Sequence, residues 1–505
     1  MSYDVIVVGS GATGSWAAKQ LTEGGRTVLV LEAGPHAGAA RPVGHRQDVQ
    51  SRCYAYNEDT RHLFVDDVDN PYETPSGTPF AWIRMRLVGG RTVLWHRVAL
   101  RMSDRQFKAA SFDGFGSDWP ISYADLQPYY DEAERFLGVA GTAARHEEIP
   151  DGVFLSAQLS PAALRFQESL QREWPDRQLT VLRRARCESP IQQHRGPYRS
   201  DADVDICFPT CSAGVALAAA ESTSRLVLRT NSAVSRVICD ESGRRVLGVE
   251  YVDCRTGATR VELSKVTVLC ASTIETTRIM LNSRSTAHPN GIGNGNGLLG
   301  RQLTEHVSGA GAMGLRDGEC HGESEFYIPN FRNRNGRAEK FLRGYGIQGY
   351  IKPGPGKTTQ CTLVSFGEML PRMENQVTLG NTQDRWGIPV ARVACRYSDN
   401  ELEMARDQAT QATQMLRQAG FDVTSVNGLN PVGCSIHEAG TAPMGRDPNT
   451  SSLNPYNRCW QVPNLLVTDG TAFPSVGFQN PTLTLMALTG RACRHILEEF
   501  HDNRW

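Results

Sequence analysis

The stretch Tyr3-Asp-Val-Ile-Val-Val-Gly-Ser-Gly-Ala-Thr-Gly14 decides the fold of this chain. Its first six residues, Tyr3–Val8, are rich in β-branched side chains and predict a strand. The pattern Gly-x-Gly-x-x-Gly follows, and then Ser15–Glu23 has the composition of a helix that Gly24-Gly25 ends. Thr27–Leu31 predicts a second strand. Strand, helix and strand in this order imply a parallel pair joined by a crossover helix.

The residues of this glycine turn have the physical tasks that a bound dinucleotide requires. Gly9 permits the tight turn, Gly11 lets a pyrophosphate approach the backbone, and Gly14 lets the helix pack closely on the strand. The start of the helix offers free N–H groups and a positive dipole end to phosphates. Glu32, at the end of the second strand, is placed to accept hydrogen bonds from the adenosine ribose. The predicted contacts of the turn are Gly9, Ser10, Gly11, Ala12 and Gly14. The motif alone fits FAD and NAD equally.

Composition restricts the class of protein. The chain has 505 residues and a formal net charge of −1, so it is long enough for two intertwined domains, and its charge does not favour nucleic acid or an anionic membrane as a partner. We find no targeting segment and no stretch near the roughly 20 apolar residues of a membrane span. The 13 cysteines are scattered and odd in number, which favours reduced thiols in a cytoplasm over a disulfide framework.

The rest of the chain alternates between predicted strands and irregular segments. A helix is predicted at Tyr123–Leu137, with Ser122 as its N-cap. Residues 308–400 contain alternating segments such as Gln360–Gly367, which predict an antiparallel sheet. A final helix is predicted at Thr482–Phe500. Further strands are predicted at Leu226–Arg229, Ala233–Cys239, Gly248–Val252, Arg260–Ala271 and Leu465–Thr468.

Five ordered motifs resemble the glucose–methanol–choline (GMC) family of FAD-dependent oxidoreductases. They lie at both ends and in the middle of the chain, and within the family they are most similar to the sugar-oxidising branch of pyranose oxidases, glycoside 3-oxidases and 3-dehydrogenases, and gluconate-type dehydrogenases. The motifs are Leu87-Val-Gly-Gly-Arg-Thr-Val-Leu-Trp-His96, Leu299-Gly-Arg-Gln-Leu-Thr-Glu-His306, Ile436-His-Glu-Ala-Gly-Thr-Ala-Pro-Met-Gly445, Asn464-Leu-Leu-Val-Thr-Asp-Gly470 and Gln479-Asn-Pro-Thr-Leu-Thr484.

The resemblance implies FAD as the cofactor and assigns residues to it. The backbone at Gly89 and Gly90 would approach the isoalloxazine, Asp469 and Gly470 would lie near the pyrophosphate and the ribityl chain, and the helix that begins at Thr482 would stabilise negative charge on the reduced flavin. Leu94 precedes Trp95 where some sugar oxidases carry a flavin-linked histidine, so we expect FAD to be bound non-covalently. The further residues assigned to the cofactor are Thr92, Val234 and Pro481.

The resemblance also implies a catalytic pair, His437 and Asn480. Oxidation of an alcohol removes a proton from oxygen and a hydride from carbon. A neutral imidazole, with a reference pKa of about 6.5, is suited to take the proton while flavin N5 takes the hydride. Asn480 would hold the substrate oxygen without titrating. The predicted activity is oxidation of an alcohol group on a sugar, a glycoside or a sugar-containing natural product, with oxygen or another molecule as electron acceptor.

Several features leave alternatives open. The substrate could be a non-sugar alcohol, and some relatives in the family are FAD-containing lyases without net redox. His96 faces the flavin or the substrate, or packs under its loop, whereas His306 is expected to be structural. Cys207-x3-Cys211 is too sparse for a metal or iron–sulfur cluster, so no metal site is predicted.

The positions of the motifs predict an α/β fold with a Rossmann-like FAD domain and an interleaved substrate domain that contains an antiparallel sheet. The FAD domain would use residues 1–110, 200–305 and 430–505, and the last of these segments carries the catalytic pair. Residues 306–429 would form the substrate domain, and the partly irregular segment 111–199 would lie on the substrate side as a lid. The oligomeric state is not predicted.

Overall fold

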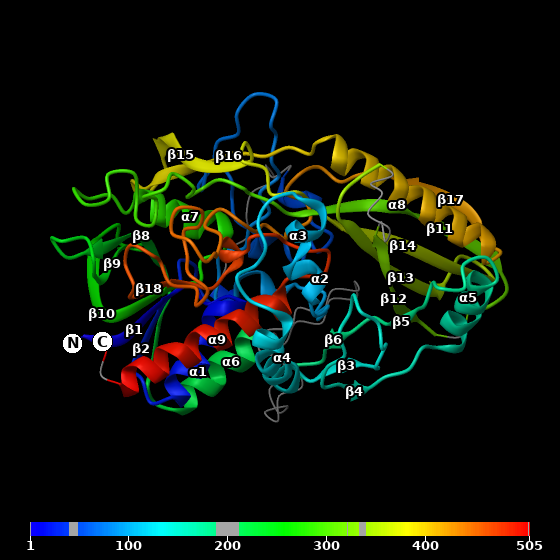
Figure 1. Cartoon of the computed structure of the whole chain (residues 1–505), viewed down its shortest axis with the longest axis horizontal. Helices are drawn as coiled ribbons and strands as arrows, with labels where there is room; N and C mark the ends of the chain where they lie inside the picture. The colour runs from blue at the N-terminus through cyan, green and yellow to red at the C-terminus, as the bar shows by residue number, and fades with distance from the viewer. Residues whose placement is uncertain are drawn as a thin grey trace.

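The computed structural model describes residues 2–39, 49–187, 212–320, 322–332, 340–502 and 504. Two large sheets lie side by side along the long axis of the molecule, and the two chain termini lie together at the outer end of the first sheet (Figure 1). The first sheet draws on residues 3–31, 226–269 and 465–467, and the second on residues 180–181 and 306–427. The α/β fold class with a Rossmann-like sheet and an antiparallel sheet is confirmed, whereas the domain boundaries stay a prediction.

The first sheet is built around the N-terminal strand. Its order is β7-β2-β1-β10-β9-β8, and β18 also pairs with β10. The pairs β7–β2, β2–β1, β1–β10 and β10–β18 are parallel, and β9 pairs with β10 and β8 in antiparallel fashion. β2 lies on one side of β1 and β10 lies on the other, so the sheet is extended from β1 in opposite directions. Ligands bind at such a topological switch point, beyond the carboxyl ends of the strands. The strands are β1 (Tyr3–Val8), β2 (Val28–Leu31), β7 (Leu226–Arg229), β8 (Ser232–Cys239), β9 (Val246–Asp253), β10 (Thr259–Leu269) and β18 (Leu465–Val467).

Helices cover both faces of this sheet. α1 (Ala12–Glu23) packs between α6 (Ser212–Ser222) and α9 (Thr482–His501), and α4 (Tyr123–Leu137) packs on α9. α7 (Thr273–Asn282) lies across the sheet from α9 (Figure 1). Among the described helices, none combines the length and the apolar character that a membrane crossing requires.

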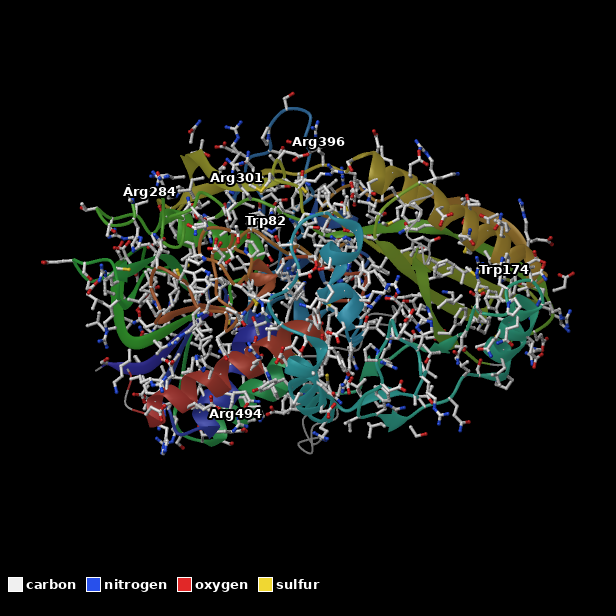
Figure 2. The ribbon with its side chains drawn as sticks, in the orientation of Figure 1. Trp82, Trp174, Arg284, Arg301, Arg396 and Arg494 are labelled. Carbon is white, nitrogen blue, oxygen red and sulfur yellow. The ribbon has the colours of Figure 1, made fainter. Side chains whose placement is uncertain are left out.

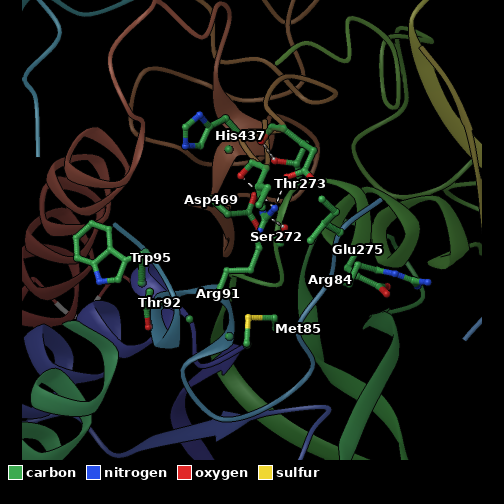
Figure 3. A pocket seen from close by; sticks show the side chains of 18 of the residues that line it. Arg84, Met85, Arg91, Thr92, Trp95, Ser272, Thr273, Glu275, His437 and Asp469 are labelled. Atoms are coloured by element: carbon green, nitrogen blue, oxygen red, sulfur yellow. Dashed lines mark hydrogen bonds and ion pairs between the residues drawn. The ribbon is translucent and has the colours of Figure 1, made fainter. Parts of the chain in front are cut away.

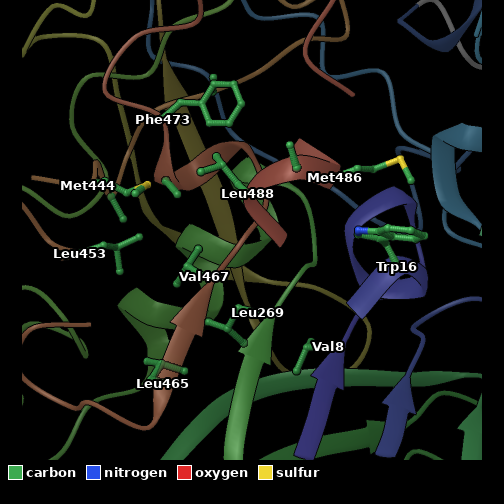
Figure 4. Close-up of a cluster of buried hydrophobic side chains, with 14 of the residues drawn as sticks. Val8, Trp16, Leu269, Met444, Leu453, Leu465, Val467, Phe473, Met486 and Leu488 are labelled. Carbon is green, nitrogen blue, oxygen red and sulfur yellow. The ribbon is translucent and has the colours of Figure 1, made fainter. Parts of the chain in front are cut away.

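The core of this half lies where the parallel strands end. Val8, Leu269 and Val467 close three neighbouring strands, and Trp16 of α1 and Leu488 of α9 pack near them (Figure 4). All five are at most 3% exposed. Burial of such side chains stabilises the fold by about 1.5–3 kcal/mol each, so the strand ends that border the ligand crevice are held rigidly.

The second sheet is antiparallel and has the order β17-β11-β14-β13-β12-β5. The helices α8 (Asp399–Gln418) and α5 (Pro161–Gln171) pack on its outer face, and the opposite face turns toward the first sheet (Figure 1). Because side chains alternate along strands, His306, Gln348 and Phe366 share one face. The strands are β5 (Thr180–Val181), β11 (His306–Asp317), β12 (Ser324–Arg332), β13 (Gly344–Pro353), β14 (Thr358–Glu368) and β17 (Asp422–Asn427).

Smaller elements join the two sheets. A three-stranded sheet has the order β4-β3-β6, and β15 and β16 form a hairpin. The segment 111–199, predicted as a partly irregular lid, contributes α4 to the helices under the first sheet and β5 to the edge of the second. The remaining elements are α2 (Asp104–Phe107), α3 (Ala109–Asp113), β3 (Val139–Gly141), β4 (Leu155–Ser156), β6 (Arg184–Ala185), β15 (Gln376–Gln383), β16 (Pro389–Ala394) and the short 3₁₀ turns η1 (Ala37–Ala39), η2 (Gln50–Arg52), η3 (Arg61–Leu63), η4 (Gly90–Val93) and η5 (Gly470–Ala472).

Positive charge is dispersed over the surface. The exposed residues Arg284, Arg396 and Arg494 lie far apart on different elements (Figure 2). Dispersed cations do not produce the strong local field that steers a polyanion to one face.

Candidate active site

The glycine turn after β1 has the geometry that close approach of a ligand requires. Gly9 has φ +95°, and a Cβ there would lie 2.5 Å from the carbonyl oxygen of Cys270. A Cβ at Gly14 would lie 1.9 Å from the Gly9 carbonyl oxygen, so only glycine lets α1 pack on this turn. By contrast, a Cβ at Gly11 would meet nothing closer than the Gly89 carbonyl oxygen at 4.0 Å. The space before Gly11 is therefore open, at the N-terminus of α1 where an anion is stabilised.

Glu32 is held at the end of β2 by the turn itself. The Ser10 hydroxyl donates to Glu32 Oε2 at 2.6 Å, the Ser10 N–H donates to the same oxygen at 3.0 Å, and the Gly34 N–H donates to Oε1 at 2.9 Å. Burial raises the pKa of this carboxyl, and the bonds from Ser10 and Gly34 oppose that rise. A carboxylate has about four acceptor positions, so one remains for a ribose hydroxyl.

The second glycine motif is tied to the first. The Gly89 N–H donates to Ser10 Oγ at 3.1 Å, and Gly89 has φ +91°, which starts the short turn η4. Inside η4 the Thr92 hydroxyl donates back to the Gly89 carbonyl oxygen at 2.7 Å. The two turns thus form one continuous backbone surface from β1 to η4.

Arg91 points from η4 toward the opposite wall (Figure 3). Its guanidinium donates to Glu438 Oε2 at 2.6 Å, to Ser272 Oγ at 3.0 Å and to the Ile436 carbonyl oxygen at 3.1 Å. This residue joins the second glycine motif to the loop before His437. Arg91 is not among the predicted site residues, although it stands within the motif Leu87–His96.

One large cavity of about 580 Å³ runs along this surface. Gly14 and Gly89 lie behind its wall, where they allow the close backbone contacts described above. Most of the residues predicted for the cofactor and for catalysis line the cavity: Gly9, Ser10, Gly11, Ala12, Glu32, Gly90, Thr92, Val234, His437, Asp469, Gly470, Asn480, Pro481 and Thr482. His96 lines it too, and so does Trp386 of the β15–β16 turn, which no sequence motif marks.

The residues present fit FAD. The space before Gly11 is open at the N-terminus of α1, where a phosphate would be held. Glu438 Oε1 and the indole nitrogen of Trp95 are buried and have no hydrogen-bond partner in the described part of the chain. Both residues line the cavity, and Trp95 is labelled in Figure 3. Buried polar atoms of this kind are costly unless a bound molecule satisfies them. The size of the cavity lies within the range of cofactor pockets.

Asp469 is fixed beneath the cavity and is 3% exposed. Its carboxylate accepts from the Thr276 hydroxyl at 2.5 Å, from the Thr471 N–H at 3.0 Å and from the Thr471 hydroxyl. Burial raises the pKa of Asp469, and these hydrogen bonds oppose the rise. The next residue, Gly470, has no room for a side chain, because a Cβ would lie 2.6 Å from the Glu438 carbonyl oxygen.

His437 and His306 contact each other directly. Their Nδ1 atoms are 2.8 Å apart, and His306 Nε2 lies 3.1 Å from the Gly477 carbonyl oxygen. A carbonyl oxygen only accepts, so neutral His306 carries its proton on Nε2 and accepts at Nδ1. His437 must then donate from Nδ1, which leaves the lone pair on its Nε2. The fold thereby selects the tautomer of His437 that has a free basic nitrogen.

The two histidines meet because one short segment anchors the loop before His437. Glu305, next to His306, accepts from the Gly433 N–H at 2.5 Å and from the Ser435 hydroxyl at 2.5 Å. On the other side of His437, Thr304 and Ala439 exchange backbone hydrogen bonds of 3.0 and 2.8 Å. Burial raises the pKa of Glu305 to about 7.

The surroundings keep His437 neutral. Burial lowers the pKa of its imidazole well below the usual value, and the nearby His306 and Arg91 lower it further. Burial also lowers the pKa of His306, to about 3. Both rings are therefore uncharged at neutral pH, the state in which His437 is able to accept a proton.

Asn480 lies just before α9, opposite the second sheet. Its Oδ1 accepts a hydrogen bond of 2.8 Å from Gln348 Nε2, and Gln348 Oε1 accepts from the Tyr350 hydroxyl at 2.9 Å. Gln348 and Tyr350 also line the cavity. No sequence motif marks them, since their only local signal is the alternation of strand β13.

His96 and the pair Cys207 and Cys211 are the less specific site candidates in the sequence. The exposed His96 ring lies 4.1 Å from the ring of Tyr54, centroid to centroid, at the cavity wall. Cys207 and Cys211 lie outside the described residues. Within the described ranges, no group of three His, Cys, Asp or Glu side chains is arranged to hold a metal ion.

Comparisons with known proteins identify the family. The chain is 29% identical to 2-methyl-1,2-propanediol dehydrogenase of Mycolicibacterium austroafricanum, an alignment that covers 99% of this chain and 96% of the relative. It is 28% identical to 6'''-hydroxyparomomycin C oxidase of Streptomyces lividus, over 99% of this chain and 92% of the relative. The crystal structure of pyridoxine 4-oxidase from Mesorbium loti has the same fold, with a TM-score of 0.62, 18% identity and coverage of 97% and 98% of the two chains. Two family models described as GMC oxidoreductase match residues 3–308 and 371–489. The chain therefore belongs to the GMC oxidoreductase family.

Proposed function

We propose that this FAD-dependent enzyme oxidises an alcohol group of a polyhydroxylated substrate, with His437 as the general base. The observation that carries the proposal is the Nε2 lone pair of a neutral His437, in one cavity with Asn480 and the glycine turns. The residues predicted from the sequence to contact FAD remain its proposed contacts, and the position of most of them around that cavity supports this.

The chain's own residues perform the proton part of the reaction. His437 Nε2 takes the hydroxyl proton, and His437 Nδ1–H keeps its bond to His306 while the ring becomes positively charged. The Asn480 amide donates a hydrogen bond to the substrate oxygen while negative charge develops on that oxygen. A fixed donor stabilises the transition state most where such charge develops. FAD, when bound, supplies the acceptor for the hydride.

The wall beyond the catalytic pair is both aromatic and polar. Phe366, whose ring centroid lies 5.9 Å from that of His437, offers ring surface on which the apolar face of a sugar or polyol can rest. Ser308 is 2% exposed, its hydroxyl has no hydrogen-bond partner in the described part of the chain, and it lines the cavity with Asn430. These groups favour a substrate with further hydroxyls, in keeping with the propanediol and the hydroxylated paromomycin in the names of the two relatives.

Anaerobic reduction of the bound flavin tests the proposal. We expect at least one member of a panel of vicinal diols, free sugars, glycosides and aminoglycosides to bleach the flavin absorbance. Readmission of oxygen then distinguishes an oxidase, which reoxidises at once, from an enzyme that uses another acceptor. His437→Ala should reduce its flavin roughly 10²–10⁴-fold more slowly with an unchanged FAD content.

The lyase alternative makes the opposite prediction. Such an enzyme would convert a substrate while its flavin stays oxidised throughout the turnover. Product formation without any bleaching, or a His437→Ala variant that reduces its flavin at the wild-type rate, would contradict alcohol oxidation by this base.

A further inference from the structure

Gln348 stands in the middle of a hydrogen-bonded chain that ends at the substrate side of the cavity. Tyr350 donates to Gln348 Oε1 at 2.9 Å, and Gln348 Nε2 donates to Asn480 Oδ1 at 2.8 Å. Gln348 is 2% exposed, so solvent does not compete for its amide. Three side chains from two distant parts of the chain, β13 and the start of α9, are thus coupled.

The direction of the hydrogen bonds in this network is set by Tyr350, its outermost member. The positive charge of the Arg184 guanidinium lies near the Tyr350 hydroxyl. A guanidinium has no acceptor atom, so the phenol hydrogen goes to Gln348 Oε1, at 2.9 Å. Burial raises the pKa of Tyr350 to about 12, so the phenol keeps that hydrogen. Gln348 then presents its NH₂ group to Asn480.

At the inner end of the network, the hydrogen bond from Gln348 sets the orientation of the Asn480 amide. Because Oδ1 of Asn480 is occupied by Gln348, the Asn480 amide must turn its Nδ2 hydrogens elsewhere. Asn480 Nδ2 donates to none of the described residues, and Asn480 lines the same cavity as His437. The donor of Asn480 is available to a substrate oxygen only while Gln348 holds this orientation.

We propose that Gln348 is a positioning residue that sets the amide orientation of Asn480, so that Asn480 offers the substrate oxygen hydrogen-bond donors and no acceptor. The inference rests on the proposed function for the identity of the ligand. In the reaction the substrate oxygen gains negative charge, which donors stabilise and an amide oxygen would repel. Asn480 with a free amide would spend part of its time in the wrong orientation.

Substitution of Gln348 by glutamate tests the inference through pH. The protonated carboxyl still donates to Asn480 Oδ1, whereas the ionised carboxylate only accepts and draws the Nδ2 hydrogens to itself. Flavin reduction by 2-methyl-1,2-propanediol should therefore be near the wild-type rate at low pH. It should fall roughly 10²-fold below the wild type as the introduced carboxyl ionises, the loss expected for one oxyanion-type donor. Among the described residues, the other charged or titratable groups at this network are Tyr350, Arg184 with its partner Glu325 at 2.8 Å, Tyr54, His96 and the catalytic-site histidines.

Two further variants separate orientation from charge and from folding. Gln348→Met removes the bond without a new charge, so reduction should slow by no more than about tenfold, with no new pH dependence. Gln360→Glu places the same charge on β14, where Gln360 bonds to Thr362 at 3.4 Å, and should behave as the wild type. FAD content and melting temperature of all variants report whether they fold.

Binding of acetate gives a readout that does not need turnover. Acetate only accepts hydrogen bonds, so it reports donors that face the cavity through its perturbation of the oxidised flavin spectrum. We expect the wild type to bind it more tightly than Gln348→Met, and Gln348→Glu to lose affinity as pH rises. If Gln348→Glu keeps a constant ratio to the wild type across pH in both assays, the inference is wrong. If no alcohol bleaches the wild-type flavin but the acetate pattern appears, the proposed function fails and the orientation of Asn480 stands.

Discussion

Replacement of His306 by leucine should slow the chemical step without loss of the cofactor. In the wild type, His306 Nδ1 accepts the hydrogen of His437 Nδ1 at 2.8 Å. A hydrogen bond between neutral groups contributes about 1 kcal/mol, and one to a charged group about 1.5–3 kcal/mol. His437 becomes charged as it takes the substrate proton, so the bond is stronger by about 0.5–2 kcal/mol in the transition state. This difference corresponds to a rate that is about 2- to 30-fold lower in His306→Leu.

The assay is anaerobic stopped-flow reduction of the flavin with the most effective alcohol of the panel, across substrate concentration. The limiting rate should fall, whereas the apparent dissociation constant of the substrate should stay close to that of the wild type, because His306 is 0% exposed and is covered by His437. His306→Asn is the matched control, since its Oδ1 restores an acceptor near the position of Nδ1, and it should recover part of the rate. Equal limiting rates in the wild type, His306→Leu and His306→Asn would show that His306 does not act through His437.

Two further predictions follow from the glycine turn and from the buried histidines. Gly11→Val should abolish FAD binding and yet leave the melting temperature of the FAD-free protein unchanged, because its side chain projects into open space. Gly14→Ala, by contrast, should destabilise even the FAD-free protein. Retained flavin in Gly11→Val, measured by absorbance after gel filtration, would contradict this prediction. Acid should weaken the fold through His306, whose pKa is lowered to about 3 by burial. Below about pH 6.5 this ring is protonated in the unfolded chain but stays neutral in the folded chain. The free energy of unfolding is therefore highest above that pH and is lower by about 2 kcal/mol at about pH 5. Urea unfolding at both pH values should show this loss in the wild type and a loss smaller by that amount in His306→Asn, and identical losses would refute the assignment.

Much of the fold was predictable from local sequence. The strand Tyr3–Val8 and the helix Tyr123–Leu137 form as predicted, the latter with Ser122 as its N-cap. Long segments whose apolar period and end signals agree leave little choice of structure. The helix α8 was not predicted, although Ser398 and Glu401 form a capping box at its start. Its sequence is polar and amphipathic, and the outer face of the second sheet supplies the contacts that stabilise it.

The sequence by itself determined where a dinucleotide could bind, because the glycine turn, the helix that follows it and Glu32 are neighbours along the chain and their tasks are local. Only the tertiary structure decided what His437 and Asn480 are able to do. His306 and His437 are 131 positions apart and Gln348 and Asn480 are 132 apart, so no local pattern connects them. Their hydrogen bonds select one imidazole tautomer and one amide orientation, and such a choice depends on which acceptor or donor the fold brings within about 3 Å. The chemistry of the site is therefore a property of the packed sheets rather than of its motifs.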